Sequence, residues 1–350
     1  MILLWHEQKP IRGCKQNRII LLLNKIDGCA FTETEFTGVT EDVLHSKMDA
    51  FFLTIPGEGD GYVASTRSIG KIYNMLDNPK YGLMIAKSVA DIYKAKEDGK
   101  KALILAFQNP NSIENSLEQL RVFYELGVRV IQMTYNDANF IGTGCCESQD
   151  GGLTDFGKRV LKMMNRLGML ADLSHVGKKT TMDIIRLSEK PVAITHAGVY
   201  NITPSVRTKT DEEMLAIKEN GGVMGISPWA PLIWKKEKGC RPDVRDYVDH
   251  VDYVVNLIGI DHVSFGADNT LDGNKDDKGT ADQAVLYPAV VGAYNSCVGT
   301  RSDERHAKGF EGCWQLENVI DEMKRRGYSE EDIAKLTGKN LLRVLRANWN

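Results

Sequence analysis

The sequence predicts an α/β fold of the (β/α)8 barrel, or TIM barrel, class, and three observations support this prediction. Short apolar runs alternate with longer amphipathic segments along nearly the whole chain. Eight such runs occur, and eight parallel strands are the number that closes this kind of barrel. The alternative is a doubly wound open sheet, but no glycine-rich phosphate-binding loop follows the first run, which disfavours it.

The expected strands are short and apolar, and most of them are separated by segments long enough for a crossover helix. Such a crossover is what parallel pairing of successive strands requires. In chain order, the expected strands are residues 19–23, 50–55, 102–107, 128–134, 169–174, 192–195, 223–227 and 262–266.

Helices are expected where apolar residues recur with a period of 3.6 residues. The expected helices are residues 113–126, 156–167, 179–188, 211–219, 315–326 and 330–345. The fourth begins with a capping box, because Thr210 can cap the helix and Glu213 lies three residues further on. The last two close the chain and are expected to pack on the outside of the barrel.

Length and composition agree with one large domain. The chain has 350 residues, which fits a single barrel. Residues 1–18 are expected to form an N-terminal extension, and residues 19–350 a single barrel domain with C-terminal helices. The net charge of -3 gives no electrostatic reason to expect nucleic acid or an anionic membrane surface as a partner. The apolar runs near the N-terminus are too short for a signal peptide or a membrane span.

The seven cysteines are an odd number and include no CxxC pair. This pattern argues against a disulfide framework or a structural zinc site, and it is typical of a reducing compartment. We therefore expect a cytoplasmic protein. The adjacent residues Cys145 and Cys146 resemble a metal or redox pair, but simple loop packing is favoured, because adjacent cysteines rarely chelate one ion.

Polar residues follow several of the expected strands, and the carboxyl ends of barrel strands share one rim. These residues are Gln108, Asn109, Tyr135, Asn136, His175, His196 and Asp268. Two imidazoles and a carboxylate on one rim suit zinc or another divalent metal. A lone histidine after a strand is more often structural, but two in the same register on successive strands favour a metal site.

Other polar residues near this rim have less specific roles. Asp172 lies three residues before His175 and is expected to orient a histidine rather than to bind a metal. Asp268 could equally cap the following helix. The histidines outside the rim pattern, including His250 and His306, are expected to be surface or packing residues.

Longer stretches of the sequence resemble a known family. They are LGVRVIQMTYNDAN, GLTDFGKRVLKMMNRLGMLADLSHVG, PVAITHAG, VRTKTDEEMLAIKENGGVMGIS, HVSFGADNTLDG and LTGKNLLRVL. Together they resemble the membrane (renal) dipeptidase family of zinc peptidases, which belongs to the metal-dependent amidohydrolase-like barrels. The similarity runs from about residue 27 to about residue 345, and LADLSH and GLTDFG are its most specific parts.

The resemblance implies a barrel that holds two zinc ions. It implies that His175 and His196 serve one zinc site, and that Gln108 stands where the family has a glutamate that bridges both ions. Asp268 matches the aspartate that serves the other ion and the attacking water. Arg207 matches the arginine that holds the substrate carboxylate. Members of this family often form dimers, so a homodimer is one option, although the sequence itself does not indicate the oligomeric state.

The sequence also departs from the family pattern. Cys29 and Phe31 replace the histidine and aspartate of the HxD motif on the first strand, Gln108 is a neutral substitute, and Tyr135 replaces a histidine. Because Phe31 cannot bind a metal, one site is expected to be lost, which leaves one zinc ion rather than two, or none. The words FQN, TYN and GCxE are similar to those of a divergent branch of the family. Glu147 in the last of these is a candidate replacement carboxylate, although a solvated loop glutamate is more common.

These residues predict a metal-dependent hydrolase that cleaves a dipeptide or a related amide with a free carboxylate. The expected metal ligands are His175, His196 and Gln108, the catalytic residues are Asp268 and Tyr135, and the substrate-binding residues are Arg207 and Asn136. Two alternatives stay open: a metal-free isomerase, tautomerase or lyase that uses the same pocket, and an inactive barrel that binds a small carboxylate. The insert at 229–245, with Trp229 and Trp234, is expected to form a wall or lid of the pocket, or to pack as a loop.

Overall fold

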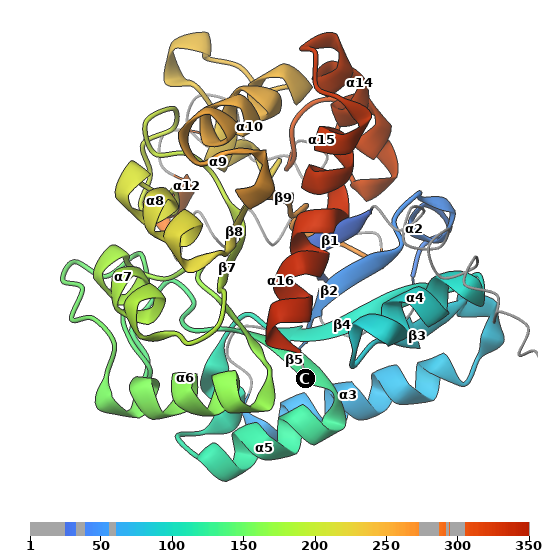
Figure 1. The fold of residues 1–350 in the computed structure, drawn as a ribbon, viewed down its shortest axis with the longest axis vertical. Coiled ribbons are helices and arrows are strands. Elements are labelled where there is room, and N and C mark those ends of the chain that lie inside the picture. Colours follow the sequence, from blue (N-terminus) through green and yellow to red (C-terminus); the bar gives the residue numbers. More distant parts are fainter. Residues whose placement is uncertain are drawn as a thin grey trace, which may run out of the picture.

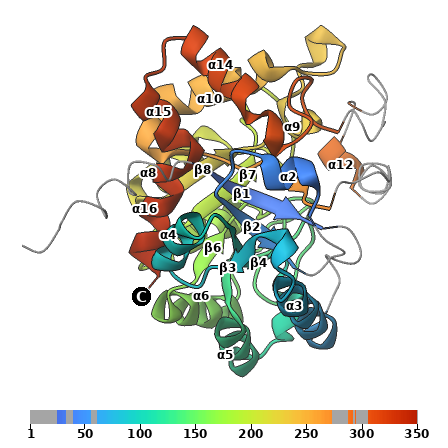
Figure 2. The ribbon, with the colours of Figure 1, turned by 90° about the vertical axis from the view of Figure 1, so that its right-hand side faces the viewer.

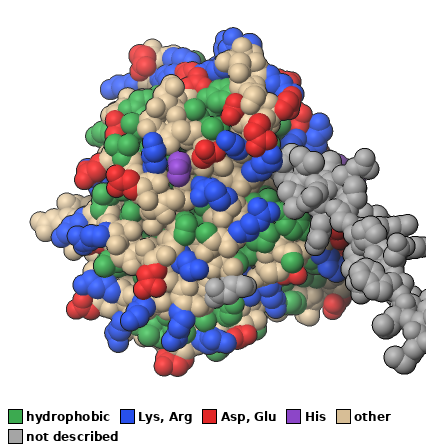
Figure 3. Space-filling model, viewed as in Figure 1, with side chains coloured by type: hydrophobic (Ala, Val, Ile, Leu, Met, Phe, Trp, Pro, Cys, Tyr) green, Lys and Arg blue, Asp and Glu red, His purple; other side chains and the backbone are tan. Residues whose placement is uncertain are grey.

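The structure is a computed structural model, and it describes residues 25–32, 39–55, 61–272, 287–291, 294 and 305–349. The strand expected at residues 19–23 and the extension expected at residues 1–18 lie outside the described residues. Within them, no helix is both long enough and apolar enough to cross a membrane. On the face shown in Figure 3, lysine and arginine side chains are mixed with aspartate and glutamate.

Parallel strands form the central sheet, and they close into a barrel (Figures 1 and 2). In the order in which they pair, they are β1 (Ile26–Phe31), β2 (Ala50–Thr54), β4 (Lys101–Phe107), β5 (Val128–Gln132), β6 (Leu170–Asp172), β7 (Ala193–Ala197), β8 (Val223–Ile226), β9 (Val263–Phe265) and β10 (Asn269–Thr270). The last two are segments of one strand position: β9 pairs with β8, and β10 pairs with β1. The expected (β/α)8 barrel is therefore confirmed, and the open doubly wound sheet is not.

Besides the two-residue β10, two strands are absent from the expected apolar runs, although the family resemblance places Cys29 and Phe31 on the first strand. The first strand of the described chain is β1, a few residues after the expected run at 19–23, and its Asp-Gly pair and Cys29 hide it from a search for apolar runs. The other is β3 (Leu83–Ile85), which pairs with the amino-terminal half of β4, whereas β5 pairs with the carboxyl-terminal half. Three residues are too few to show a period.

Helices surround the sheet, and local signals determine their ends. They are α3 (Tyr62–Leu76), α4 (Val89–Glu97), α5 (Leu117–Leu126), α6 (Asp155–Leu167), α7 (Lys178–Leu187), α8 (Asp211–Asn220), α10 (Val244–Ile258) and α14 (Leu316–Arg325). The expected capping box of α8 is present, with Thr210 and Glu213 in both of its contacts. The helix expected at 113–126 begins later, because Ser116 caps α5 and a short 3-10 turn precedes it.

The end of the chain corrects one expectation. Residues 330–345 form α15 (Glu330–Ala334), a wide turn at Lys335–Lys339 and α16 (Asn340–Asn348), and not one exterior helix. Leu341, Leu342, Val344 and Leu345 of α16 share an apolar cluster with residues at the amino ends of the strands, including Ile26 and Val223. Figure 1 shows α16 lying across the middle of the barrel. This helix thus closes the amino-terminal opening, which leaves the carboxyl-terminal rim for a site.

Candidate active site

Two histidines converge at the carboxyl-terminal rim. His175 follows β6 and His196 lies on β7, and their Nε2 atoms are 3.1 Å apart. Both side chains are buried, with 7% of His175 and 0% of His196 exposed. Strands β6 and β7 are neighbours in the barrel, so the parallel pairing brings together two residues that are 21 positions apart in the sequence.

The hydrogen bonds around these rings assign their tautomers. His175 Nδ1 lies 2.9 Å from Asn136 Oδ1, which is an acceptor, so this nitrogen carries the proton. His196 Nδ1 lies 2.8 Å from Thr195 Oγ1, and that hydroxyl gives its own proton to Asp172 Oδ2 at 2.6 Å. Both rings are therefore protonated at Nδ1, and two Nε2 lone pairs face each other. That arrangement is repulsive unless a cation lies between them.

Burial keeps both imidazoles neutral. It holds the pKa of His175 well below its usual range, and the nearby charge of Arg207 acts in the same direction. Burial likewise lowers the pKa of His196 to about 4, although the carboxylate of Asp268 opposes the shift. Neutral imidazole is the form that binds metal ions. At neutral pH the pair is thus in the state that a metal requires.

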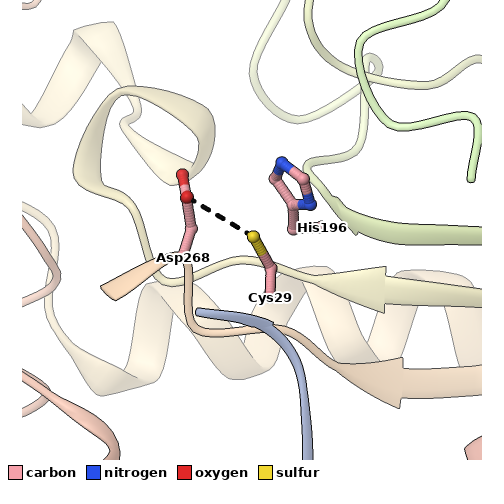
Figure 4. A group of neighbouring side chains, drawn as sticks. All are labelled: Cys29, His196 and Asp268. Carbon is pink, nitrogen blue, oxygen red and sulfur yellow. Dashed lines mark hydrogen bonds between the residues drawn. The ribbon is translucent and has the colours of Figure 1, made fainter. Parts of the chain in front are cut away.

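A second group of side chains adjoins His196. Cys29 ends the Asp-Gly-Cys segment of β1, and its Sγ lies 3.6 Å from Asp268 Oδ1 (Figure 4). Gln108, directly after β4, donates from Nε2 to Cys29 Sγ at 3.1 Å. Asp268 has a left-handed backbone with φ of 54°, and its N–H donates to the Cys29 carbonyl at 2.8 Å. Strand pairing between β1 and the last strand thus positions the carboxylate.

The carboxylate of Asp268 is stabilised in its ionised form. Burial by itself would raise the pKa of this carboxyl, but the positive charges of His196 and His306 in their protonated forms and of Arg305 and Arg207 outweigh it, and the pKa is lowered overall. His306 Nε2 also lies 3.1 Å from the Asp268 carbonyl oxygen. By contrast, burial and the charge of Asp268 raise the pKa of the Cys29 thiol.

Tyr135 and Asn136 connect the histidines to a pocket. The Tyr135 ring stacks on His175, with ring centroids 4.1 Å apart and an angle of 20° between the planes. It lines a pocket of about 340 Å³ together with Asn109, Asn111, Asp137, Ala138, Asn139 and Tyr287. Asn136 is fully buried with φ of 51°, so its contact with His175 is a positioning contact, and substrate binding by Asn136 stays a prediction.

Arg207 is buried beside the backbone that carries the two histidines. It is 2% exposed, and its terminal nitrogens donate to the carbonyls of Ser174 and, at 2.9 Å, of His196. These contacts hold the backbone that carries both histidines. Each terminal nitrogen has a second N–H, which is available to hold a substrate carboxylate. The carboxylate contact expected for Arg207 therefore stays a prediction.

Other singled-out residues lie outside this group. Glu147 is exposed, and its Oε1 accepts from the Ala138 N–H at 2.9 Å, so it caps a loop. Cys145 Sγ lies 3.4 Å from Asn136 Oδ1, and its pKa is lowered to about 7, chiefly by a hydrogen bond from Cys146. Within the insert, Trp229 and Trp234 pack in an apolar cluster that also includes Val290, Val291 and Tyr294.

Sequence reasoning missed several members of the site. Cys29 had been noted only as a lost ligand, and His306 had been placed among packing residues, although it lies against Asp268. Thr195 is not among the residues that the sequence predicts for the site. Its position directly before His196 was the one available signal, because a hydroxyl there can accept from the ring nitrogen.

Comparisons with known proteins identify the family of the chain. The family model "Membrane dipeptidase (Peptidase family M19)" matches residues 27–293 and 288–349. Dipeptidase tcpJ of Claviceps purpurea is 30% identical over 264 residues, which are 75% of this chain and 54% of that protein. Dipeptidase aclJ of Aspergillus oryzae is 29% identical over 283 residues, or 80% and 60% of the two chains. The chain thus spans a little more than half the length of these relatives.

Solved structures agree with the fold. An amidohydrolase from Pseudomonas aeruginosa has a TM-score of 0.82 and 30% identity, and the match covers 95% of this chain and 98% of the other. A metallopeptidase from Rhodobacter sphaeroides, solved with a phosphinate mimic of the dipeptide L-Ala-D-Ala, has a TM-score of 0.74 at 19% identity and covers 94% and 100%. Since the family model matches nearly all the described residues, the chain belongs to the membrane dipeptidase family of metallopeptidases, peptidase family M19.

Proposed function

We propose that this protein is a zinc-dependent dipeptidase that works with one metal ion held by His175 and His196. The observation that supports this proposal is the pair of Nε2 atoms, 3.1 Å apart, on two buried, neutral imidazoles. Substrates would be dipeptides or related amides with a free carboxylate, in keeping with the relatives named dipeptidases.

The residues present fit a zinc ion. Two imidazole nitrogens on one tetrahedral zinc, at about 2.0–2.1 Å from the metal, lie about 3.3 Å from each other, close to the separation seen here. In such sites, the ring nitrogen that does not bind the metal is typically hydrogen-bonded to a neighbouring group, which orients the ring. Asn136 makes this contact with His175, and Thr195, itself bound to Asp172, makes it with His196. Gln108 is a further proposed ligand through Oε1, because its Nε2 donates to Cys29.

Each remaining group then has one task. When bound, the ion supplies Lewis-acid chemistry, which makes a water molecule more acidic and polarises the substrate carbonyl. Asp268, ionised at neutral pH, accepts a proton from the water and later returns it to the leaving amine. Tyr135, next to His175 at the pocket, donates a hydrogen bond to the developing oxyanion.

Substrate binding is proposed for two more residues. The remaining N–H groups of Arg207 would hold the substrate carboxylate, and Asn136 would contact the substrate beside Tyr135. One ion rather than two follows from Phe31, whose ring lies under the Arg305 guanidinium, with 4.8 Å from the central carbon to the ring centroid. A homodimer and a cytoplasmic location remain predictions.

The test combines metal content with hydrolysis. His175→Ala should lose both its zinc, about one ion per chain in the parent protein, and its activity on a panel of dipeptides. His45→Ala, on the exposed face of α2 (Glu41–His45), is the matched control and should keep both. Elemental analysis of the purified proteins and amine release from the dipeptides are the measurements.

Two outcomes would contradict the proposal. Hydrolysis by a metal-free parent protein would exclude the zinc-dependent reaction. A parent protein with neither metal nor dipeptide hydrolysis would favour a metal-free isomerase, tautomerase or lyase, or an inactive carboxylate-binding barrel. Turnover or simple binding of small carboxylates would then separate these two.

A further inference from the structure

We infer that Cys29 is a metal ligand, and that Cys29, His196 and Asp268 form a sulfur-containing site for a thiophilic divalent ion. This inference rests on the proposed function and deepens it, because His196 belongs to both groups. Cys29 is therefore a new ligand and not merely the residue left by a lost site.

The geometry brings the three ligand atoms together. They come from β1, from β7 and from the residue before β10, and all lie within 4.8 Å of one another (Figure 4). Among the described residues, this is the one cluster of three such side chains. In a tetrahedral zinc site, sulfur and carboxylate oxygen are about 3.6 Å apart, which matches the 3.6 Å between Cys29 Sγ and Asp268 Oδ1.

The surroundings of Cys29 are those of a ligand and not of a packing residue. Its Sγ is contacted by the Asp268 carboxylate and by the Gln108 amide, and Cys29 belongs to none of the three apolar clusters formed by the described residues. Cys313 is equally buried but packs within the largest apolar cluster. An N–H donor such as Gln108 Nε2 is the outer contact that a bound thiolate favours.

Charge balance explains what the thiolate supplies. Of the three side chains, His196 is neutral, so without a thiolate Asp268 would be the one negative charge of this cluster that faces a divalent ion. A Cys29 thiolate adds a second negative charge. In the family this charge comes from the aspartate of the HxD motif, and Phe31, which stands in its place here, carries none. On binding, the Cys29 S–H loses its proton to the solvent and a sulfur–metal bond forms.

This ligand set also predicts the metal class. Thiolate with imidazole favours zinc or cobalt over magnesium or calcium, which prefer oxygen ligands alone.

Cobalt(II) titration of the metal-free full-length chain tests the inference. The parent protein should develop thiolate-to-cobalt charge-transfer absorption in the near ultraviolet, and added zinc should abolish it. Cys29→Ser should lose this absorption, and its affinity for zinc should fall by more than about 100-fold. This loss is larger than the one expected for a residue that only hydrogen-bonds to a metal ligand. Cys313→Ser and the double variant Cys145→Ser with Cys146→Ser are the matched controls, and both should keep the absorption.

A second variant guards against misfolding. Cys29→His restores the residue type of the family and should bind cobalt with near-parental affinity but without the sulfur absorption. Two results would overturn the inference. One is a parent protein that binds cobalt without the thiolate absorption, and the other is an absorption that is lost only in the Cys145 and Cys146 double variant. If dipeptide hydrolysis persists in that case, the proposed function stands, whereas a parent protein that binds no metal contradicts both.

Discussion

At the scale of single residues, the site depends on which nitrogen of each imidazole carries its proton. Asp172 determines the tautomer of His196 through Thr195. It accepts the proton of the Thr195 hydroxyl, so that Thr195 Oγ1 can accept a hydrogen bond from His196 Nδ1. The same carboxylate accepts from the backbone N–H groups of Ser174 and Thr195. One buried residue thus orients both strand ends that carry the histidines.

Asp172→Asn should therefore weaken zinc binding by about 10–100-fold while the fold is kept, which is the loss typical of outer contacts of a metal site. An amide can turn an N–H toward Thr195, and the hydroxyl then donates to His196 Nδ1, which moves the ring proton to Nε2, the nitrogen that faces His175. Competition with a chromogenic chelator measures the affinity. Asp211→Asn, whose carboxylate binds Tyr253 away from the site, is the control. Parental affinity in Asp172→Asn would contradict this role.

At the scale of secondary-structure elements, glycine allows the strands that carry the site to approach closely. A Cβ on Gly225 of β8 would lie 1.9 Å from the Thr195 carbonyl oxygen, and one on Gly266 would lie 2.1 Å from it. The register between β7 and β8 shifts at this point. The backbone next to His196 is thus packed directly against its neighbours, with no room for a side chain.

Gly225→Ala should destabilise the protein by about 2–3 kcal/mol, because the added methyl group must push the Thr195 carbonyl aside. The displacement also shifts His196, so metal affinity should fall. Gly70→Ala in α3 meets nothing within 4 Å and should be neutral or stabilising by up to about 1 kcal/mol. Denaturant unfolding measures both, and equal stability of the two variants would refute the packing explanation.

His250 joins α10 to the loop after β7 and makes stability depend on pH. It is fully buried, and its Nδ1 accepts the Val199 N–H at 3.0 Å. Burial lowers its pKa from the ordinary 6.5 to about 3, so between these values the unfolded chain binds more protons than the folded one. The contribution of a neutral His250 is therefore complete above pH 6.5 and is lost as the pH falls toward 3.

His250→Asn, whose Oδ1 can replace Nδ1 as acceptor, should remove this dependence. Between pH 6 and pH 4, we expect the unfolding free energy of the parent protein to fall by about 1.4 kcal/mol per pH unit more than that of the variant. Denaturant unfolding across this range provides the comparison. Parallel pH profiles for the two proteins would show that the buried imidazole does not titrate in this way.

At the scale of the whole molecule, the barrel unites distant parts of the chain at one point. Cys29 and Asp268 are 239 positions apart, yet their side chains are in contact because the last strand pairs with the first. At the other end, α16 closes the amino-terminal opening with its leucines. A metal at the carboxyl-terminal rim would therefore link the first strand of the barrel to the last.

Zinc should consequently stabilise the whole fold. A ligand that binds only the folded state adds about 2.7 kcal/mol when its free concentration is 100 times Kd. We expect zinc to raise Tm by several degrees over a sample treated with a chelator, and His196→Gln to lose this shift. Calorimetry gives the measurement. Identical Tm values with zinc and with chelator in the parent protein would argue against a metal that bridges the strands.

The sequence by itself determined the barrel class, most of the strands and helices, and the two histidines, because these depend on local periodicity and on the rule that strand ends share a rim. Tertiary structure decided the rest. The place of α16 depends on a turn at Gly338 and on a complementary apolar opening, and neither has a local signature. The neighbours of Cys29 were likewise decided by barrel closure, since a side chain becomes a ligand through what lies within a few ångströms of it, and not through its position along the chain.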